Sequence, residues 1–159
     1  MEKYEESLEK ALKELKIADH IIYITYNLIR DKRLLLKALD QESLALTYLI
    51  NAILQYEYLW KRIQLYSDSR NNFDTFINKC SKRYNITQEE IEEVKNILSI
   101  SQLHKKSPME FQRREKIIMM TEDLSTASID HEKLKSYLEL IKRIIKKALF
   151  VWKTSKSSF

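Results

Sequence analysis

The chain of 159 residues contains no glycine and a single proline, Pro108. A soluble protein of this length usually contains about 11 glycines. Glycine provides left-handed helix caps, tight turns and close backbone approach to phosphates. Walker loops, dinucleotide-binding fingerprints and nucleophile elbows all require glycine at fixed positions, so these sites are excluded. We therefore expect a helical chain whose turns are built from Asn, Asp and Ser.

Length and composition predict one domain over residues 1–153, followed by a frayed tail at 154–159. Apolar runs such as Ile117–Met120 are much shorter than the ~20 residues of a transmembrane helix. The acidic start Met1–Glu6 lacks the apolar core of a signal peptide. Cys80 is the single cysteine, so it cannot form an internal disulfide. These features favour a cytoplasmic location.

The hydrophobic periodicity predicts an all-α or nearly all-α fold, an antiparallel bundle of about four to five helices. The second helix is apolar around much of its circumference, so we expect it at the centre, with a kink or second start at Gln41–Ser43. Thr87 and Glu90 have the spacing of a capping box that opens a later helix. The expected helices are Glu2–Ile29, Lys32–Leu65, a short one through Phe73–Cys80 after a turn at Ser67–Asn72, one from Gln88 to about Leu103, and a final one from Asp130 to Trp152.

Two segments between the last helices are less regular. Ser107–Glu110 contains proline at a first helical position, which predicts a brief helix over 108–115. Lys116–Ile129 contains two short apolar or β-branched runs around Glu122–Leu124. This pattern fits a β-hairpin at about 116–129, but a short apolar run also fits a helix, and both alternatives stay open.

The first two helices resemble the HEPN-like superfamily of small α-helical bundles. The residues that carry this resemblance are His20–Tyr23, Asp31–Leu36 and Ala45–Glu57. The wider sequence also resembles an uncharacterised archaeal helical-bundle family, at Lys16–His20, Arg83–Ile86 and His104–Phe111. The resemblance implies a helical-bundle fold and a tendency to dimerise or to bind partners.

The HEPN-like superfamily that this chain resembles has catalytic members, which are metal-independent ribonucleases. In these members an Arg is followed, after four to six intervening residues, by a His. The corresponding positions before His20, His104 and His131 contain no Arg. The resemblance therefore does not bring ribonuclease activity to this chain by the usual motif, and the chain is expected to be non-enzymatic.

No metal site or cofactor is expected from the sequence. A di-iron bundle needs Glu-x-x-His pairs, and no histidine here has Glu three positions before it. An antiparallel pairing of the first two helices brings His20 near Glu42, which favours a hydrogen-bonded structural histidine over an acid–base role. Cys80 lies at apolar spacing with Phe73, Phe76 and Ile77, so we expect it to pack in the core.

Positive charge is concentrated at the C-terminal end. Residues 131–159 contain eight Lys or Arg against two Glu and sum to +6, whereas the whole chain is +5 and residues 1–130 sum to −1. The final helix can present a nucleic-acid-binding face, or the same residues can be an ordinary solvated helix face. The candidate residues are Lys135, Lys142, Arg143, Lys146, Lys147 and Lys153.

The leading functional hypothesis is a non-enzymatic binding or adaptor module, a possible homodimer, with a protein or RNA partner. The alternative is a ribonuclease or other hydrolase of atypical motif that uses His104 with Arg113 or Arg114, beside Lys105 and Lys106. Attachment to a membrane surface through residues 134–152 is a third possibility. The aromatic pair Tyr56 and Trp60 is expected to pack within the protein rather than to stack on bases.

Overall fold

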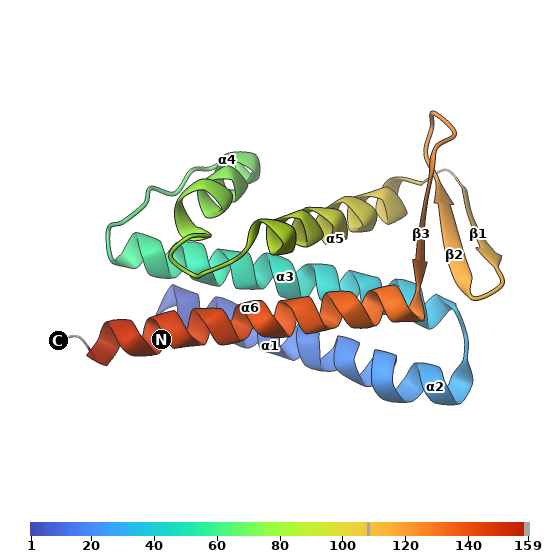
Figure 1. The fold of residues 1–159 in the computed structure, drawn as a ribbon, viewed down its shortest axis with the longest axis horizontal. Coiled ribbons are helices and arrows are strands. Elements are labelled where there is room, and N and C mark those ends of the chain that lie inside the picture. The colour runs from blue at the N-terminus through green and yellow to red at the C-terminus, as the bar shows by residue number, and fades with distance from the viewer. Residues whose placement is uncertain (108, 158–159) are drawn as a thin grey trace.

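The computed structural model describes residues 1–107 and 109–157 and shows a mostly helical chain with a small antiparallel sheet (Figure 1). Residues 108, 158 and 159 lie outside the described residues. The elements are α1 Lys3–His20, the π-helical η1 Ile21–Thr25, α2 Tyr26–Ile29, α3 Arg33–Leu59, α4 Ser69–Thr75, the π-helical η2 Phe76–Cys80, α5 Gln88–Lys106, β1 Met109–Arg113, β2 Lys116–Met120, β3 Thr126–Asp130 and α6 His131–Ser157.

Helix α3 is the central helix, as its apolar sequence predicts. It packs against α1, α5 and α6, and α1 and α5 run in the opposite direction to α3 and α6 (Figure 1). Leu46, Leu49 and Ile53 are completely buried along its length. The helix is continuous through Gln41–Ser43, so the expected second start there is wrong, and it ends at Leu59 rather than Leu65.

Turns without glycine are formed here mainly by charged residues, which the sequence did not predict. Arg30, Lys61, Asn85, Arg114 and Leu124 have positive φ between 55° and 69°. This backbone region is costly for residues with a Cβ and is tolerated best by Asn. The expectation that Asn, Asp and Ser build the turns therefore holds at Asn85, at Asp68 and in the turn of Asp123–Ser125, whereas Arg, Lys and Leu occupy the other positive-φ positions.

The helix starts follow side-chain capping. Asp31 accepts the backbone N–H of Arg33 at 2.9 Å, and Thr87 and Glu90 form the predicted capping box of α5. Asp68 accepts the backbone N–H of Arg70, so α4 begins at Ser69, inside the segment expected to be a turn. At α6, Asp130 accepts the backbone N–H of Lys133 at 2.8 Å.

The predicted hairpin is confirmed as β2 and β3, which pair antiparallel with Ile118 opposite Ser128. The brief helix expected over 108–115 is wrong, because Met109–Arg113 forms β1 and pairs with β2; Pro108, on which that expectation depended, lies outside the described residues. The hydroxyl of Ser107 donates to the carbonyl oxygens of both Met109 and Met120 and holds the start of β1 against β2.

Helix α6 lies along α3 and carries the apolar stripe that its sequence predicts. Leu134, Leu138, Ile141, Ile145 and Ala148 are all buried. The helix continues past the expected end at Trp152 to Ser157, over much of the segment expected to be frayed. Its C-terminal end lies beside the N-terminus of α1, at the opposite end of the protein from the sheet (Figure 1).

Among the described residues, no helix combines the length and the apolar character that a membrane span requires.

Candidate functional site

Four of the six basic residues predicted as a nucleic-acid-binding face contact other residues of the chain. Lys142 Nζ lies 2.6 Å from Asp19 on α1, and Lys147 Nζ lies 2.5 Å from Glu90 on α5. Arg143 also contacts Glu90, at 3.4 Å. Lys135 contacts Glu132 on its own helix. The charges of α6 therefore hold it to its neighbours, which the sequence-based interpretation of one continuous basic face did not anticipate.

Glu90 is the centre of the contacts between α5 and α6. Its side chain is 9% exposed, and it accepts hydrogen bonds from Lys147, Arg143 and the backbone N–H of Thr87. Burial alone would raise the pKa of Glu90, but these hydrogen bonds and the charge of Lys147 together lower it. Glu90 is therefore the structural counter-ion for two of the predicted RNA-contacting residues.

Lys142 is similarly engaged with α1. Burial alone would lower its pKa, but the hydrogen bond to Asp19 and the charges of Asp19 and Glu139 raise it. Tyr23 donates its hydroxyl hydrogen to Glu139 at 2.8 Å, and this hydrogen bond raises the pKa of the phenol. Lys135 and Lys142 both lie within 6 Å of the centre of the Tyr23 ring. This cluster joins α6 to the first helical segment.

The other two predicted residues, Lys146 and Lys153, are exposed and have no ion pair among the described residues. The structure adds Lys82, which precedes α5 and is also exposed without such a partner. Lys82 and Lys146 line a hollow of about 440 Å³ between the η2–α5 connection and α6. We call this region the basic corner; it consists of Lys153 and the hollow's lining residues Lys82, Arg83, Tyr84, Asn85, Lys146, Lys147, Phe150 and Val151.

The lining of the hollow contains four cationic side chains and, among the described residues, no carboxylate. Phe150 is 68% exposed at its edge, on the solvent-facing side of α6, where a large aromatic side chain is less common than a polar one. A ring beside unpaired lysines offers a stacking surface and phosphate contacts together. No sequence pattern predicts that Lys82 and Phe150 share a site, because only folding brings residues 82 and 150 together.

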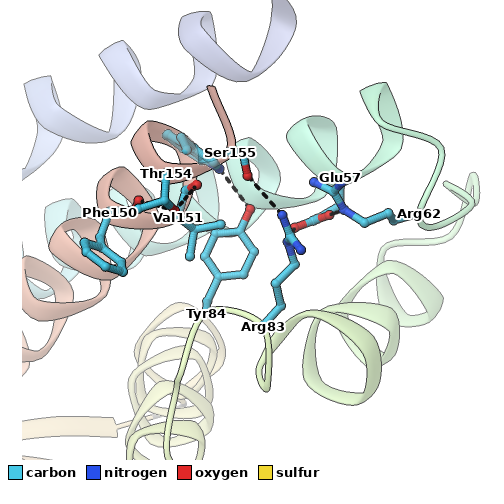
Figure 2. Close-up of polar contacts among 9 residues, drawn as sticks. Glu57, Arg62, Arg83, Tyr84, Phe150, Val151, Thr154 and Ser155 are labelled. Atoms are coloured by element: carbon cyan, nitrogen blue, oxygen red, sulfur yellow. Dashed lines mark hydrogen bonds and ion pairs between the residues drawn. The ribbon is translucent and has the colours of Figure 1, made fainter. Parts of the chain in front are cut away.

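An ionic cluster around the buried Glu57 supports the wall of the basic corner (Figure 2). The side chain of Glu57 is 2% exposed and forms ion pairs with Arg62 and, at 2.8 Å, with Arg83. Arg83 also donates to the hydroxyl of Ser155 on α6 at 3.0 Å. The cluster therefore joins the end of α3 to the last turns of α6 and fixes the direction of Arg83.

Tyr84 forms the inner wall of the hollow. Its hydroxyl accepts a hydrogen bond from Trp152 Nε1 at 2.8 Å (Figure 2). Burial is the main cause that raises the pKa of this phenol above its ordinary value, with a further contribution from the Glu57 charge. Tyr84 is therefore a buried, hydrogen-bonded phenol at the inner wall of the hollow.

The residues of the hydrolase alternative are not brought together. His104 contacts Glu110 on β1 at 2.7 Å and Asp40 on α3 at 3.8 Å. Arg113 is three residues along β1 from Glu110, so it lies on the opposite face of the strand, and Arg114 is in the following turn. Lys105 and Lys106 are exposed at the end of α5, at the sheet end of the protein and away from the basic corner (Figure 1).

The remaining candidate residues have different surroundings. His20 is exposed, whereas Glu42 is completely buried with no hydrogen-bond partner among the described residues, so the expected contact between them does not form. Cys80 is 1% exposed, as predicted, and burial raises its pKa to about 12. Tyr56 packs against Trp60 and Trp152, which confirms its role within the protein.

Two further findings bear on possible ligands. The described residues contain no group of three or more His, Cys, Asp or Glu side chains arranged to hold a metal ion. The apolar stripe of α6, on which attachment to a membrane surface would depend, is buried in the core.

No protein-family model, curated protein or solved structure matches this chain. The resemblance to HEPN-like proteins and to the archaeal helical-bundle family therefore stays a prediction.

Proposed function

We propose that this chain is a non-enzymatic, HEPN-like helical-bundle module of the cytoplasm that binds single-stranded RNA at the basic corner. The observation that carries the proposal is the carboxylate-free hollow in which unpaired Lys82 and Lys146 lie beside the exposed ring of Phe150. Single-stranded nucleic acids are bound by this combination of cationic side chains and stacking aromatic rings.

The pairing of charges supports this location over the rest of α6. A lysine already bonded to a carboxylate must break that contact before it can bind phosphate, so Lys142 and Lys147 are poor first contacts. Lys82, Lys146 and Lys153 have no carboxylate partner among the described residues, so they can bind phosphate without first breaking an ion pair. Lys146 and Lys153 lie on α6 with Phe150, and Lys82 lies in the connection before α5. A flexible single strand of RNA can contact both of these segments, which favours it as the ligand.

The dimensions of the hollow indicate a short binding site. A volume of about 440 Å³ accommodates roughly one nucleotide, and stacking on a single ring contributes about 1–3 kcal/mol. With three free lysines, binding is therefore modest, dependent on salt and tolerant of base sequence. We infer that duplex RNA is bound less tightly, because its bases cannot stack on Phe150.

A homodimer stays a prediction of the family resemblance. The surface formed by Ile24, Leu28 and Ile29 near the end of α2 is exposed and apolar, but nothing in the structure covers it. Analytical ultracentrifugation of the purified chain measures this state directly and is independent of the RNA proposal.

The proposal is tested by fluorescence anisotropy with a labelled 12-nucleotide RNA without secondary structure, at low salt. The variant Lys82→Gln/Lys146→Gln/Lys153→Gln removes the three free cations of the basic corner. The matched control Lys13→Gln/Lys16→Gln/Lys37→Gln removes the same charge from exposed residues of α1 and α3. We expect at least a tenfold loss of affinity in the first variant and less than threefold in the control.

Equal losses in the two variants would show that only the net charge matters, and absence of RNA binding by the unmodified chain would exclude the proposal. Thermal unfolding of both variants checks that neither change alters the fold.

A further inference from the structure

We propose a second binding site, for a small organic anion with an aromatic or other apolar body, in the groove between α3 and α5. This groove has a volume of about 740 Å³ and is bordered at one end by α4. It lies on different elements from the basic corner, so the proposal is independent of the RNA proposal. The size is that of a site for one small molecule.

The seam between the two helices explains why a groove exists. Helices α3 and α5 run antiparallel (Figure 1), and His104 on α5 lies 3.8 Å from Asp40 on α3. Ser43 lies about one helical turn after Asp40 on α3, and Ser101 lies about one helical turn before His104 on α5. Both serines line the groove. Small side chains on both sides of the seam leave space that larger apolar residues would have filled.

Ser101 shows that this space is polar as well as open. Its side chain is 2% exposed, and its hydroxyl has no hydrogen-bond partner among the described residues. A buried hydroxyl without a partner is destabilising, so native proteins usually satisfy it. A ligand oxygen in the groove would supply the missing partner.

The positively charged side chains around the groove favour an anionic ligand. Arg70, Lys95 and Lys105 line it, and no Asp or Glu occurs among its described lining residues. Lys95 lies 3.7 Å from Glu92 on its own helix, whereas Arg70 and Lys105 have no side-chain ion pair among the described residues. Two free cations, one from α4 and one from α5, therefore approach the same groove.

The apolar residues at the floor of the groove favour a ligand with an apolar body. Ile50 and Leu54 on α3 are buried, and Phe73 on α4 and Leu98 on α5 are half-buried beside them. Apolar side chains at the floor with cations at the edge fit a molecule with an apolar body and an anionic head. A phosphate and a carboxylate are equivalent in this chemistry, so the experiment compares them.

The probes are 1-naphthyl phosphate and 1-naphthoate, titrated into the full chain and followed by isothermal titration calorimetry. Neutral 1-naphthol lacks the head, and inorganic phosphate lacks the apolar body. We expect the two naphthyl anions to bind at least tenfold more tightly than either control probe. Equal binding of 1-naphthol, or no binding of either naphthyl anion, would overturn the proposal.

Two variants locate the binding. Arg70→Gln/Lys105→Gln removes the free cations from exposed positions, and Ser101→Ala removes the hydroxyl that has no hydrogen-bond partner among the described residues. We expect about a tenfold loss of naphthyl-anion affinity in each, with no loss of thermal stability. The matched variant Lys82→Gln/Lys146→Gln should leave this affinity unchanged.

If the naphthyl anions bind but their affinity falls only in Lys82→Gln/Lys146→Gln, the groove is not the site and the proposal is wrong. RNA affinity should be unchanged in Arg70→Gln/Lys105→Gln and Ser101→Ala. This comparison makes failure of the groove proposal distinguishable from failure of the RNA proposal.

Discussion

Two buried glutamates on α3 differ in their partners, and this difference predicts opposite effects of the same substitution. Glu42 is 0% exposed, and neither of its carboxyl oxygens has a hydrogen-bond partner among the described residues. Glu57 is 1% exposed but is paired with Arg62 and Arg83. Methionine has a similar length and a high helix propensity, so Glu42→Met and Glu57→Met remove the carboxyl with little other change.

Burial raises the pKa of Glu42 well above its ordinary value of 4.5. When the pKa of a carboxyl is higher in the folded state than in the unfolded state, its protonation stabilises the folded state. This contribution to the free energy of unfolding is fully present below pH 4.5. As pH rises above that value, the unfolded chain loses this proton first, so the free energy of unfolding falls by about 1.4 kcal/mol per pH unit until the folded group also ionises. Glu42→Met removes this loss and also the unsatisfied buried group, which costs about 1–3 kcal/mol.

The assay is urea unfolding of the unmodified chain, Glu42→Met and Glu57→Met between pH 5 and pH 8. We expect Glu42→Met to be the most stable at pH 7, with an advantage that grows as pH rises from 5. Glu57→Met should be less stable than the unmodified chain by about 1–2 kcal/mol, because it removes the charged partner of Arg62 and Arg83, whose own side chains are partly exposed to water. If Glu42→Met is destabilised, or if its advantage does not change with pH, the description of Glu42 as a buried, unpartnered acid is wrong.

Three further predictions follow from other side chains. Phe150→Ala should weaken RNA binding about fivefold or more without lowering thermal stability, because the ring is 68% exposed; unchanged anisotropy titrations would contradict its role in stacking. Glu90→Gln should reduce the free energy of unfolding by about 1–2 kcal/mol at pH 7, since it removes the negative charge that pairs with Lys147 and Arg143. The pKa of Glu90 is lowered in the folded state, so this difference is present above pH 4.5 and should shrink as pH falls through the lowered value; a difference constant down to pH 3 would refute it. Cys80 should react with a thiol reagent at pH 8 only after unfolding in urea, because burial raises its pKa to about 12; rapid reaction of the folded chain would show an accessible thiol.

Local sequence patterns predicted the elements that depend on nearby residues. The capping box of Thr87 and Glu90, the cap at Asp130 and the hairpin of β2 and β3 each depend on residues a few positions apart. Strand β1 was mistaken for a helix because proline after Ser107 resembles a helix start. No apolar periodicity follows it, and pairing with β2 decides the conformation instead.

The candidate site could be predicted only in part, because charge pairing depends on the tertiary structure. Lys142 and Lys147 find their counter-ions 123 and 57 residues away in the sequence, on α1 and α5. Four of the six basic residues predicted from the sequence are therefore paired within the chain: Lys135, Lys142, Arg143 and Lys147. Lys82 is distant in sequence from Lys146, so no local pattern joins them in one hollow.

The salt dependence of RNA binding tests the central claim most directly. Each phosphate contact with a single strand contributes about −0.7 to the slope of log affinity against log salt concentration. Replacement of Lys82, Lys146 and Lys153 by Gln should therefore make this slope less steep by about 2 units. The matched variant at Lys13, Lys16 and Lys37 should keep the slope of the unmodified chain. Unchanged slopes in the first variant would show that the RNA does not bind at the basic corner.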